Sequence, residues 1–176
     1  MTKKITNLFS AATIAIVLVA CGDKKKEEAI VAPQGMNVLD LTNHGKPFAI
    51  FVPDTTTAKL IVTEQTSGAL DIKVGVSFAI TINEQAADIE LKKTDIKGDE
   101  VNKFKSFITE EPTAIFWESE VTKPEFHFLI NQKIGTSEYS IEDTKSTEAE
   151  PLSKDNTQKM FDSAKGIKEI KKQLAS

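Results

Sequence analysis

Few side chains in this sequence could take part in covalent or acid–base chemistry. Cys21 is the only cysteine, and His44 and His127 are the only histidines. A thiol is the strongest nucleophile among these groups near neutral pH, and an imidazole can act as an acid, a base or a metal ligand. The surroundings of these three residues therefore decide which chemistry is open to the chain.

Cys21 directly follows the features of an export signal. Lys3 and Lys4 precede a run of thirteen mostly apolar residues, 8–20. The run is too short to cross a bilayer, which requires about 20 apolar residues, and it has the length of a signal-peptide core. The sequence therefore predicts an exported protein.

Leu18-Val19-Ala20-Cys21, at the end of this run, resembles the lipobox of bacterial lipoproteins. The resemblance implies that Cys21 receives a diacylglycerol, that a peptidase removes residues 1–20, and that the new amino group becomes available for acylation. Two acyl chains hold a protein stably on a membrane, because each buried methylene contributes about 0.8 kcal/mol. The membrane is thus the first expected partner, through lipid on Cys21.

The residues after Cys21 favour the outer membrane or the cell surface slightly over the periplasmic face of the inner membrane. Three lysines and two glutamates, residues 24–28, look like the surface-export signal of lipoproteins in some Gram-negative lineages. Asp23 after Gly22 resembles an inner-membrane retention signal of other lineages. A charged run is also typical of a solvated linker, so both locations in the cell envelope stay open.

Neither histidine belongs to a recognisable chemical motif. His44 lies in a predicted turn before Gly45, and His127 alternates with Phe126 and Phe128, so it should point away from their apolar face into solvent. The sequence contains no His-x-x-x-His, Cys-x-x-Cys, calcium-loop, Gly-x-Ser-x-Gly or glycine-rich phosphate pattern. We therefore expect no catalytic residue, no cofactor and no metal site, and a protein that is not an enzyme.

Carboxylates gather at two places in the sequence. Glu118 and Glu120 share one face of a predicted strand, where charges commonly protect a sheet edge from pairing. The second group surrounds a predicted loop. Weak binding of a divalent ion by this group is one interpretation, although solvated charge explains it without a ligand. Its members are Glu138, Glu142, Asp143, Glu148 and Glu150.

Three further residues have predicted roles. Trp117 and Tyr139 are expected to pack in the core rather than to stack on a ligand. Asp54-Thr55-Thr56 resembles a three-residue O-glycan acceptor of some exported bacterial proteins. The resemblance implies Thr55 as a modification site, whereas a second match, at Ser163, lies inside a predicted helix.

Composition limits the partners of the chain. The net charge is −4, and it becomes −6 without residues 1–20, which contain two lysines. All basic residues are lysine. Without arginine there is no bidentate group for phosphate or guanine, so nucleic acid is not an expected partner. With the one cysteine lipidated there is no disulfide, and burial must stabilise the fold.

Alternation of apolar and polar residues predicts an antiparallel sheet of about five to six strands. The clearest signal is residues 70–82, where seven apolar side chains occupy the even positions. We expect one long strand there, with a bulge or kink at Gly75. Alternation with one wet face favours antiparallel pairing. Other strands are predicted at residues 48–52, 59–65, 114–121, 125–134 and 137–143, and a short entry strand is an option at residues 36–41.

Two segments have helical spacing. Residues 86–111 are predicted as one interrupted central helix or two consecutive helices, because apolar residues recur at helical intervals after Gly98: Val101, Phe104, Phe107 and Ile108. An amphipathic C-terminal helix begins near Ser153 and presents Met160, Ala164, Ile167 and Leu174 on one face. The predicted fold class is α+β, with the sheet packed against both helical segments.

The order of these elements is similar to that of the PsbP and DcrB type of small exported proteins. The likeness covers residues 46–172, through Phe48-Ala49-Ile50-Phe51-Val52-Pro53 and the helix closing near Ile167-Lys168. It implies a central antiparallel sheet between helices, and adaptor roles more than chemistry. The expected organisation is a signal peptide at 1–20, a charged linker at 21–35 and one α+β domain at 36–176.

The sequence thus predicts a lipid-anchored cell-envelope protein that acts as a non-catalytic binding or accessory module. Its expected partner besides the membrane is another envelope protein. The alternative is a small envelope enzyme, or a carrier of a small ligand or metal ion, with acidic residues at one end of the sheet forming the site.

Overall fold

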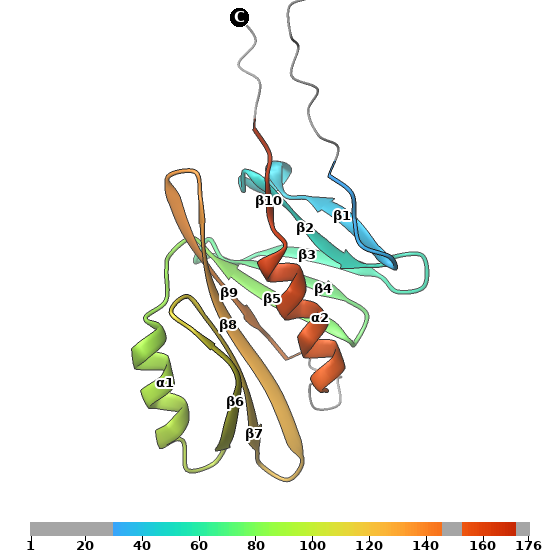
Figure 1. Cartoon of the computed structure of the whole chain (residues 1–176). Coiled ribbons are helices and arrows are strands. Elements are labelled where there is room, and N and C mark those ends of the chain that lie inside the picture. Colours follow the sequence, from blue (N-terminus) through green and yellow to red (C-terminus); the bar gives the residue numbers. More distant parts are fainter. Residues whose placement is uncertain (1–29, 146–152, 172–176) are drawn as a thin grey trace, which may run out of the picture.

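The computed structural model describes residues 30–145 and 153–171, which form an α+β fold in three layers (Figure 1). A seven-stranded antiparallel sheet is the middle layer. A three-stranded antiparallel sheet and helix α2 (Lys154–Lys165) together cover one face of it. Helix α1 (Ile89–Gly98) covers part of the opposite face.

In the large sheet, strands that follow one another in sequence pair as hairpins, and β5 pairs with β9 to join the two halves. The strands in spatial order are β3 (Leu60–Glu64), β4 (Leu70–Val74), β5 (Phe78–Asn83), β9 (Ser137–Asp143), β8 (Pro124–Ile134), β7 (Ala114–Glu120) and β6 (Lys103–Glu111). The strand predicted at residues 137–143 is confirmed with both of its ends.

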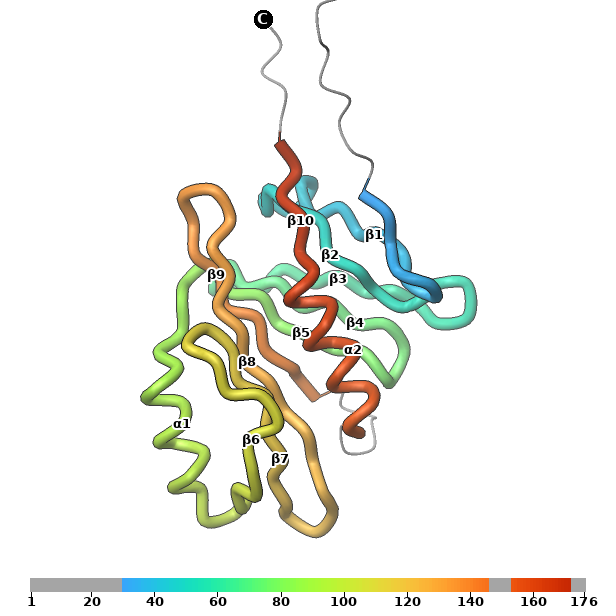
Figure 2. Tube along the Cα trace, in the orientation of Figure 1, coloured from blue at the N-terminus to red at the C-terminus, as the bar shows by residue number. Residues whose placement is uncertain are grey.

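The small sheet is built around β2 (Phe48–Pro53), which lies between β1 (Met36–Asp40) and β10 (Lys168–Glu169). A 3₁₀ turn, η1 (Thr42–His44), leads from β1 toward β2. Five of the six residues of β2 are buried, so this strand must be covered on both faces. The large sheet lies on one side of β2, and α2 runs beside it (Figure 2).

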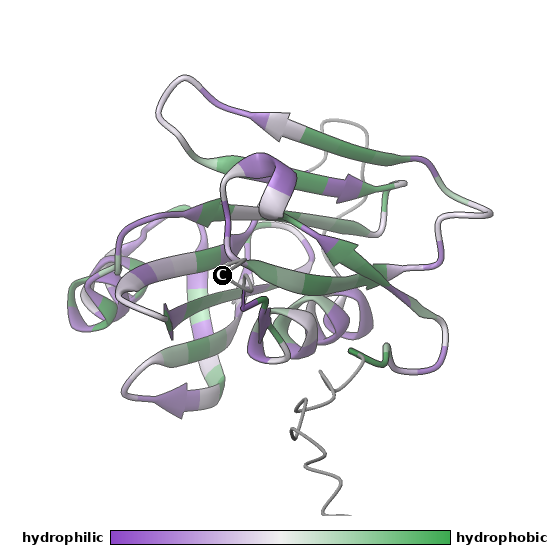
Figure 3. Ribbon diagram, turned by 90° about the horizontal axis from the view of Figure 1, so that it is seen from above, coloured by the Kyte–Doolittle hydropathy of each residue, from purple (hydrophilic) through white to green (hydrophobic). Residues whose placement is uncertain are grey.

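The main core lies between the large sheet, β2 and α2. Helix α2 begins at Ser153, whose hydroxyl accepts a hydrogen bond from the Asn156 N–H. Its buried face includes Phe161, whose ring stacks on Phe116 and meets Phe128 edge-on. In Figure 3 hydrophobic residues (green) run along the strands, whereas the helices carry both hydrophobic and hydrophilic (purple) residues. This is expected for helices that pack one face on a core.

A second, smaller core lies under α1. Asp88 caps this helix by accepting from the Leu91 N–H, and Ile89 packs with Ile115, Trp117 and Leu129. The outward face of β7 and β8 is therefore buried in part, rather than wet throughout.

Residues 70–82 form a hairpin, not the single long strand that the alternation predicts. β4 ends at Val74, β5 begins at Phe78, and these two residues are paired. Gly75 has a φ of +57°, a left-handed conformation that favours glycine. Gly75 therefore turns the chain back instead of bulging a continuous strand.

The prediction of a helix over residues 86–111 is wrong for its second half. Helix α1 ends at Gly98, and residues 103–111 form β6, the edge strand of the large sheet. Two irregularities interrupt its register with β7, between Phe104 and Ser106 and between Phe107 and Thr109. The sheet is consequently larger than predicted, and a second sheet is present.

The C-terminal helix is shorter than predicted. It stops at Lys165, and the Gly166 N–H donates to Asp162 and Ser163 carbonyls at its end. Ile167 lies beyond the helix and Leu174 lies outside the described residues, as do the predicted signal peptide and most of the charged linker. In the described ranges, neither helix has the length and apolar content needed to cross a membrane.

Candidate binding site

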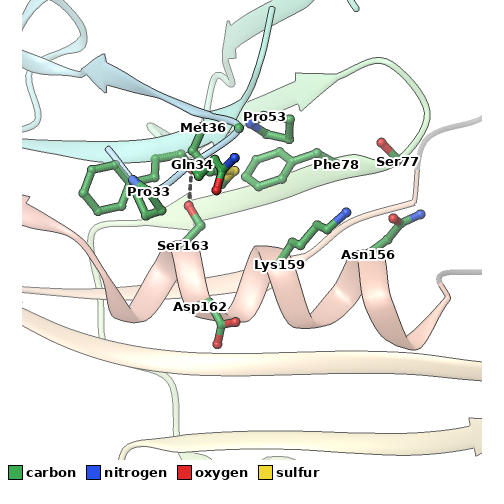
Figure 4. A pocket seen from close by; sticks show the side chains of 12 residues that line it. Pro33, Gln34, Met36, Pro53, Ser77, Phe78, Asn156, Lys159, Asp162 and Ser163 are labelled. Atoms are coloured by element: carbon green, nitrogen blue, oxygen red, sulfur yellow. Dashed lines mark hydrogen bonds between the residues drawn. The ribbon is translucent and has the colours of Figure 1, made fainter. Parts of the chain in front are cut away.

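A cavity of about 380 Å³ lies between α2, the end of β2 and the segment that leads into β1 (Figure 4). We call it the α2 pocket. Its apolar lining comes from Pro33, Met36, Phe51, Pro53 and Phe78, and its polar lining from Gln34, Ser77, Asn156, Lys159, Asp162 and Ser163. The volume falls within the range of about 300–1,000 Å³ that is usual for small-molecule sites.

Backbone contacts hold the segment before β1 in place. Gly35 has a φ of +77°, the Met36 N–H donates to the Pro33 carbonyl, and the Asp54 N–H donates to the Gly35 carbonyl. This tight turn brings residues 33–36 against the far end of β2. One wall of the α2 pocket therefore consists of the last residues of the predicted linker, 33–35, and of Met36.

Helix α2 supplies the opposite wall. The Ser163 hydroxyl donates a hydrogen bond to the Phe51 carbonyl, which fixes the helix on β2. At the helix end, a Cβ added to Gly166 would lie 3.2 Å from ring atoms of Phe51, so only glycine allows this close approach without a shift. These contacts make the α2 pocket a preformed feature of the fold.

The α2 pocket offers apolar contact at its base and hydrogen bonds at its rim. Figure 4 shows Gln34 and Phe78 on one side, and Asn156, Lys159 and Ser163 along α2 on the other. Asp162 points away from them, and its carboxylate accepts from the Gln158 side chain. The charged group directed at the pocket from α2 is therefore the Lys159 ammonium.

His127 is buried, not exposed as predicted. The imidazole Nδ1 lies 2.8 Å from Oδ2 of Asp143, and Nε2 lies 3.6 Å from Oε2 of Glu125. The residue is 9 % exposed, and its ring is tilted against that of Trp117. The alternation placed His127 correctly on the face away from Phe126 and Phe128, but that face is covered.

Asp143 connects β9 to two groups of β8. Its Oδ1 accepts from the Phe128 N–H at 2.6 Å, while Oδ2 accepts from the His127 ring. Glu125 in turn accepts from Lys145 at 2.8 Å. A chain of charged and hydrogen-bonded groups thus crosses the α1 side of the sheet. For Asp143 the sequence suggested solvated charge or weak binding of a divalent ion, not a buried pair with His127.

The two predicted carboxylate groups are not brought together as sites. Glu120 accepts from Lys105 at 2.6 Å, and this hydrogen bond lowers the pKa of Glu120 and raises that of Lys105. In the second group, Glu142 lies 3.7 Å from Lys92 and Glu138 is exposed, while Glu148 and Glu150 lie outside the described residues. Among residues 30–145 and 153–171, no three His, Cys, Asp or Glu side chains are arranged to hold a metal ion.

The remaining residues considered in the sequence analysis are two aromatic residues, a threonine, a histidine and the cysteine. Tyr139 is buried and meets Phe48 edge-on with 5.0 Å between ring centroids, and Trp117 is buried under α1, so the core prediction is confirmed for both. Thr55 lies in the loop after β2 and accepts a hydrogen bond from Asn37. The His44 imidazole contacts Glu64 at 2.9 Å, and Cys21 lies outside the described residues.

The α2 pocket could not be predicted from local sequence patterns. Its walls come from residues 33–36, from the end of β2 and from α2, which lie far apart in the chain. A partial signal for the buried His127 is present in Ala114-Ile115-Phe116-Trp117, a continuous apolar run that predicts burial on both faces of the strand.

Comparison of the chain with protein-family models, with curated proteins and with solved structures gives no match.

Proposed function

We propose that this protein is a lipid-anchored, non-catalytic binding module of the cell envelope, and that the α2 pocket is its ligand site. The observation that carries the proposal is the α2 pocket itself: a preformed cavity with an apolar base, a polar rim and one ammonium group. The lipid anchor is proposed from the lipobox-like residues that end in Cys21.

The lining favours an amphipathic ligand with an anionic end. Met36, Phe51 and Phe78 offer apolar surface to a hydrocarbon or ring. Lys159 provides a positive charge near the rim, and Gln34 and Asn156 provide hydrogen-bonding groups. A carboxylate or a similar anion on an apolar body matches this arrangement.

The position of the α2 pocket suits a ligand drawn from a membrane. Cys21 precedes Pro33, a lining residue, by twelve positions. Even a fully extended chain of that length spans no more than about 40 Å. A lipid on Cys21 would therefore hold the pocket close to the bilayer, at the outer membrane or cell surface in the preferred arrangement and at the inner membrane in the alternative one.

An accessory role toward another envelope protein is the second part of the proposal. It rests on the resemblance to the PsbP and DcrB type. The structure offers one surface that suits such a partner: β6 is an edge strand, and Ile108 on it and Val101 just before it are exposed apolar residues. An extended segment of a partner could pair with such an edge.

A small envelope enzyme is the alternative function. The observation in its favour is the Asp143–His127 pair, in which a carboxylate orients an imidazole. Ser119 lies on the same face of the sheet, and its hydroxyl is buried without a hydrogen-bond partner. The amphipathic-ligand proposal is preferred because its cavity is larger and its lining converges on one space.

Calorimetric titration with octanoate and octanol tests the ligand site. The full-length Cys21→Ser chain is used because it carries no lipid on residue 21, so no acyl chain of the protein competes with octanoate for the site. We expect saturable binding of octanoate that is about three- to tenfold weaker in Lys159→Gln, with octanol binding unchanged in that variant. Lys154→Gln, on the same helix but outside the pocket lining, is the matched control and should bind octanoate like the parent chain.

Absence of saturable octanoate binding would remove the proposed ligand class. Equal affinities in Lys159→Gln and Lys154→Gln would place any binding outside the α2 pocket. Hydrolysis of a panel of ester and amide substrates that is lost in His127→Gln would support the enzyme alternative instead.

A further inference from the structure

A second cavity, of about 200 Å³, lies under α1, on the face of the large sheet opposite to the α2 pocket. We call it the Trp117 hollow. It is lined by Lys92, Ile96, Asp99, Asn102, Trp117 and His127. None of these residues lines the α2 pocket.

The α1 side of the sheet holds side-chain atoms that lack hydrogen bonds. In the described part of the chain, three buried side-chain atoms have no hydrogen-bond partner: Oδ1 of Asn102, Oγ of Ser119 and Nε2 of His127. Two of them belong to residues that line the Trp117 hollow, and Ser119 lies on the same sheet face. Buried polar atoms in proteins nearly always have a hydrogen-bond partner, so an unpaired one calls for a partner from outside the chain.

Both unpaired atoms of the hollow are acceptors when the His127 ring is neutral. A carboxylate can only accept, so the His127 Nδ1–H donates to Asp143. In the neutral ring this leaves a lone pair on Nε2, and Oδ1 of Asn102 is a carbonyl oxygen. The missing partner is consequently a group that donates at least two hydrogen bonds.

The charges near the Trp117 hollow favour a positive donor. Asp99 lines the hollow, and the N–H groups of Asn102 and Val101 lower the pKa of its carboxyl group, which keeps it ionised. Asp143 lies 2.8 Å from Nδ1 of His127, and Glu125 lies 3.6 Å from Nε2, so the two carboxylates flank the ring. With Glu142, the carboxylates around the hollow number four, against the two ammonium groups that contact them, those of Lys92 and Lys145.

Lys92 shows that the site accepts a cation. Its Nζ lies 5.9 Å from the centre of the Trp117 ring and 3.7 Å from Oε2 of Glu142. The indole face therefore already attracts an ammonium group, and Glu142 neutralises that group. A second ammonium group would lie between the acceptors of Asn102 and His127, with Ile96 contacting its short carbon chain.

We propose that the Trp117 hollow binds a small ligand that carries a primary ammonium group. The ammonium group donates to Oδ1 of Asn102 and to Nε2 of His127, and its charge is balanced by Asp99. A cavity of about 200 Å³ has room for an amine with a short carbon chain, and excludes a bulky quaternary ammonium ion.

Tryptophan fluorescence tests this proposal directly, because Trp117 is the only tryptophan in the chain. The full-length protein is titrated with n-butylammonium chloride, and tetrabutylammonium chloride, sodium butyrate and zinc chloride serve as comparison titrants. We expect a saturable change in Trp117 emission with n-butylammonium alone. In Asn102→Leu, which removes one acceptor at a partly exposed position, the dissociation constant for n-butylammonium should rise about tenfold.

Asn43→Leu is the matched control, since Asn43 is exposed in η1 and is not among the lining residues of the hollow. It should bind n-butylammonium like the parent chain. Equal binding in Asn102→Leu and in the parent, or no saturable change in emission with n-butylammonium, would overturn the proposal. A response to zinc in place of the amine would also overturn it. Octanoate binding in the α2 pocket is measured separately, so the two proposals can fail independently.

Discussion

Asp143 accepts one hydrogen bond from the side chain of His127, at 2.8 Å, and one from the backbone N–H of the next residue, Phe128, at 2.6 Å. One carboxylate from the end of β9 thereby fixes both a ring and the backbone of β8. The Asp143 side chain is only 7 % exposed, so water cannot readily replace these bonds.

Asp143→Ala should lower the free energy of unfolding by about 3 kcal/mol, because it leaves two buried donors without an acceptor. Urea denaturation of the variant and the parent measures this difference. Glu138→Ala is the matched control: Glu138 is an exposed residue of the same strand, and its loss should change stability by less than about 0.5 kcal/mol. Equal effects of the two substitutions would show that Asp143 has no special structural role.

Asp99 should make stability depend on pH in the acid range. Hydrogen bonds from the Asn102 and Val101 N–H groups lower its pKa below the ordinary value of 3.8. The ionised carboxylate therefore stabilises the fold above that value, and this contribution is lost as the pH falls through the lower pKa of the folded state. Asp99→Asn carries no charge at any pH, so the stability difference between parent and variant should shrink from about pH 6 to about pH 3. A constant difference across that range would contradict the assignment.

Gly75→Ala should destabilise the β4–β5 hairpin. The φ of +57° is unfavourable for alanine by about 1–2 kcal/mol, and the new Cβ would lie 3.2 Å from the Cβ of Ala58. Gly98→Ala is a suitable control, because nothing lies within 4 Å of its added Cβ and it ends α1 with a negative φ. Thermal unfolding should show a lower midpoint for the first variant and an unchanged or higher one for the second.

Cys21→Ser should abolish lipid attachment, because the lipobox-like sequence implies that the Cys21 thiol is the group that receives the lipid. Cells fed a fatty-acid analogue should label the parent chain and not the variant, and the variant should keep residues 1–20. In Triton X-114 extraction the parent should enter the detergent phase. Labelling that persists in Cys21→Ser would remove the lipid anchor from the proposed function.

Thr55→Ala tests the predicted O-glycan. Thr55 lies in a loop, where a modifying enzyme can reach the backbone. Intact mass spectrometry of protein from its native cells should show a carbohydrate increment on the parent and none on the variant. Thr57→Ala, two positions further along the same loop, should keep the increment. An unmodified mass for the parent chain would refute the prediction.

The order and type of most strands could be predicted from alternation, and β6 could not. In β6 two register irregularities, around Lys105 and Ile108, add residues to one side of the ladder. Phe104 and Phe107 consequently reach the same face, with 4.7 Å between their rings, although they are three positions apart. A bulged strand thus acquires the spacing of a helix, and this is why residues 101–108 suggested one.

The β4–β5 hairpin escaped prediction for a different reason. Three residues, Gly75, Val76 and Ser77, separate the paired residues Val74 and Phe78. An odd number of turn residues preserves the alternation through the turn, so the apolar residues stay at even positions on both strands. Only the left-handed Gly75 marks the reversal, and a glycine in a strand also fits a bulge.

The candidate site was the least predictable part of the molecule. The face of His127 follows from alternation, but its burial depends on α1 and on Trp117, which come from other parts of the sequence. The α2 pocket likewise depends on the turn at Gly35 and on the contact between Ser163 and Phe51. Such features arise from packing between distant elements, which local patterns do not report.

The short strand β10 covers part of one edge of β2. Lys168 and Glu169, with the Ile170 N–H bonded to the Pro47 carbonyl, are the residues that occupy one side of β2. A protease that cut after Gly166 would remove this cover and expose the backbone N–H and C=O groups of Phe48 and Ala49 on that edge. Two clipped molecules would then expose the same short stretch of β2, and such an open edge is a surface on which strands of separate molecules pair.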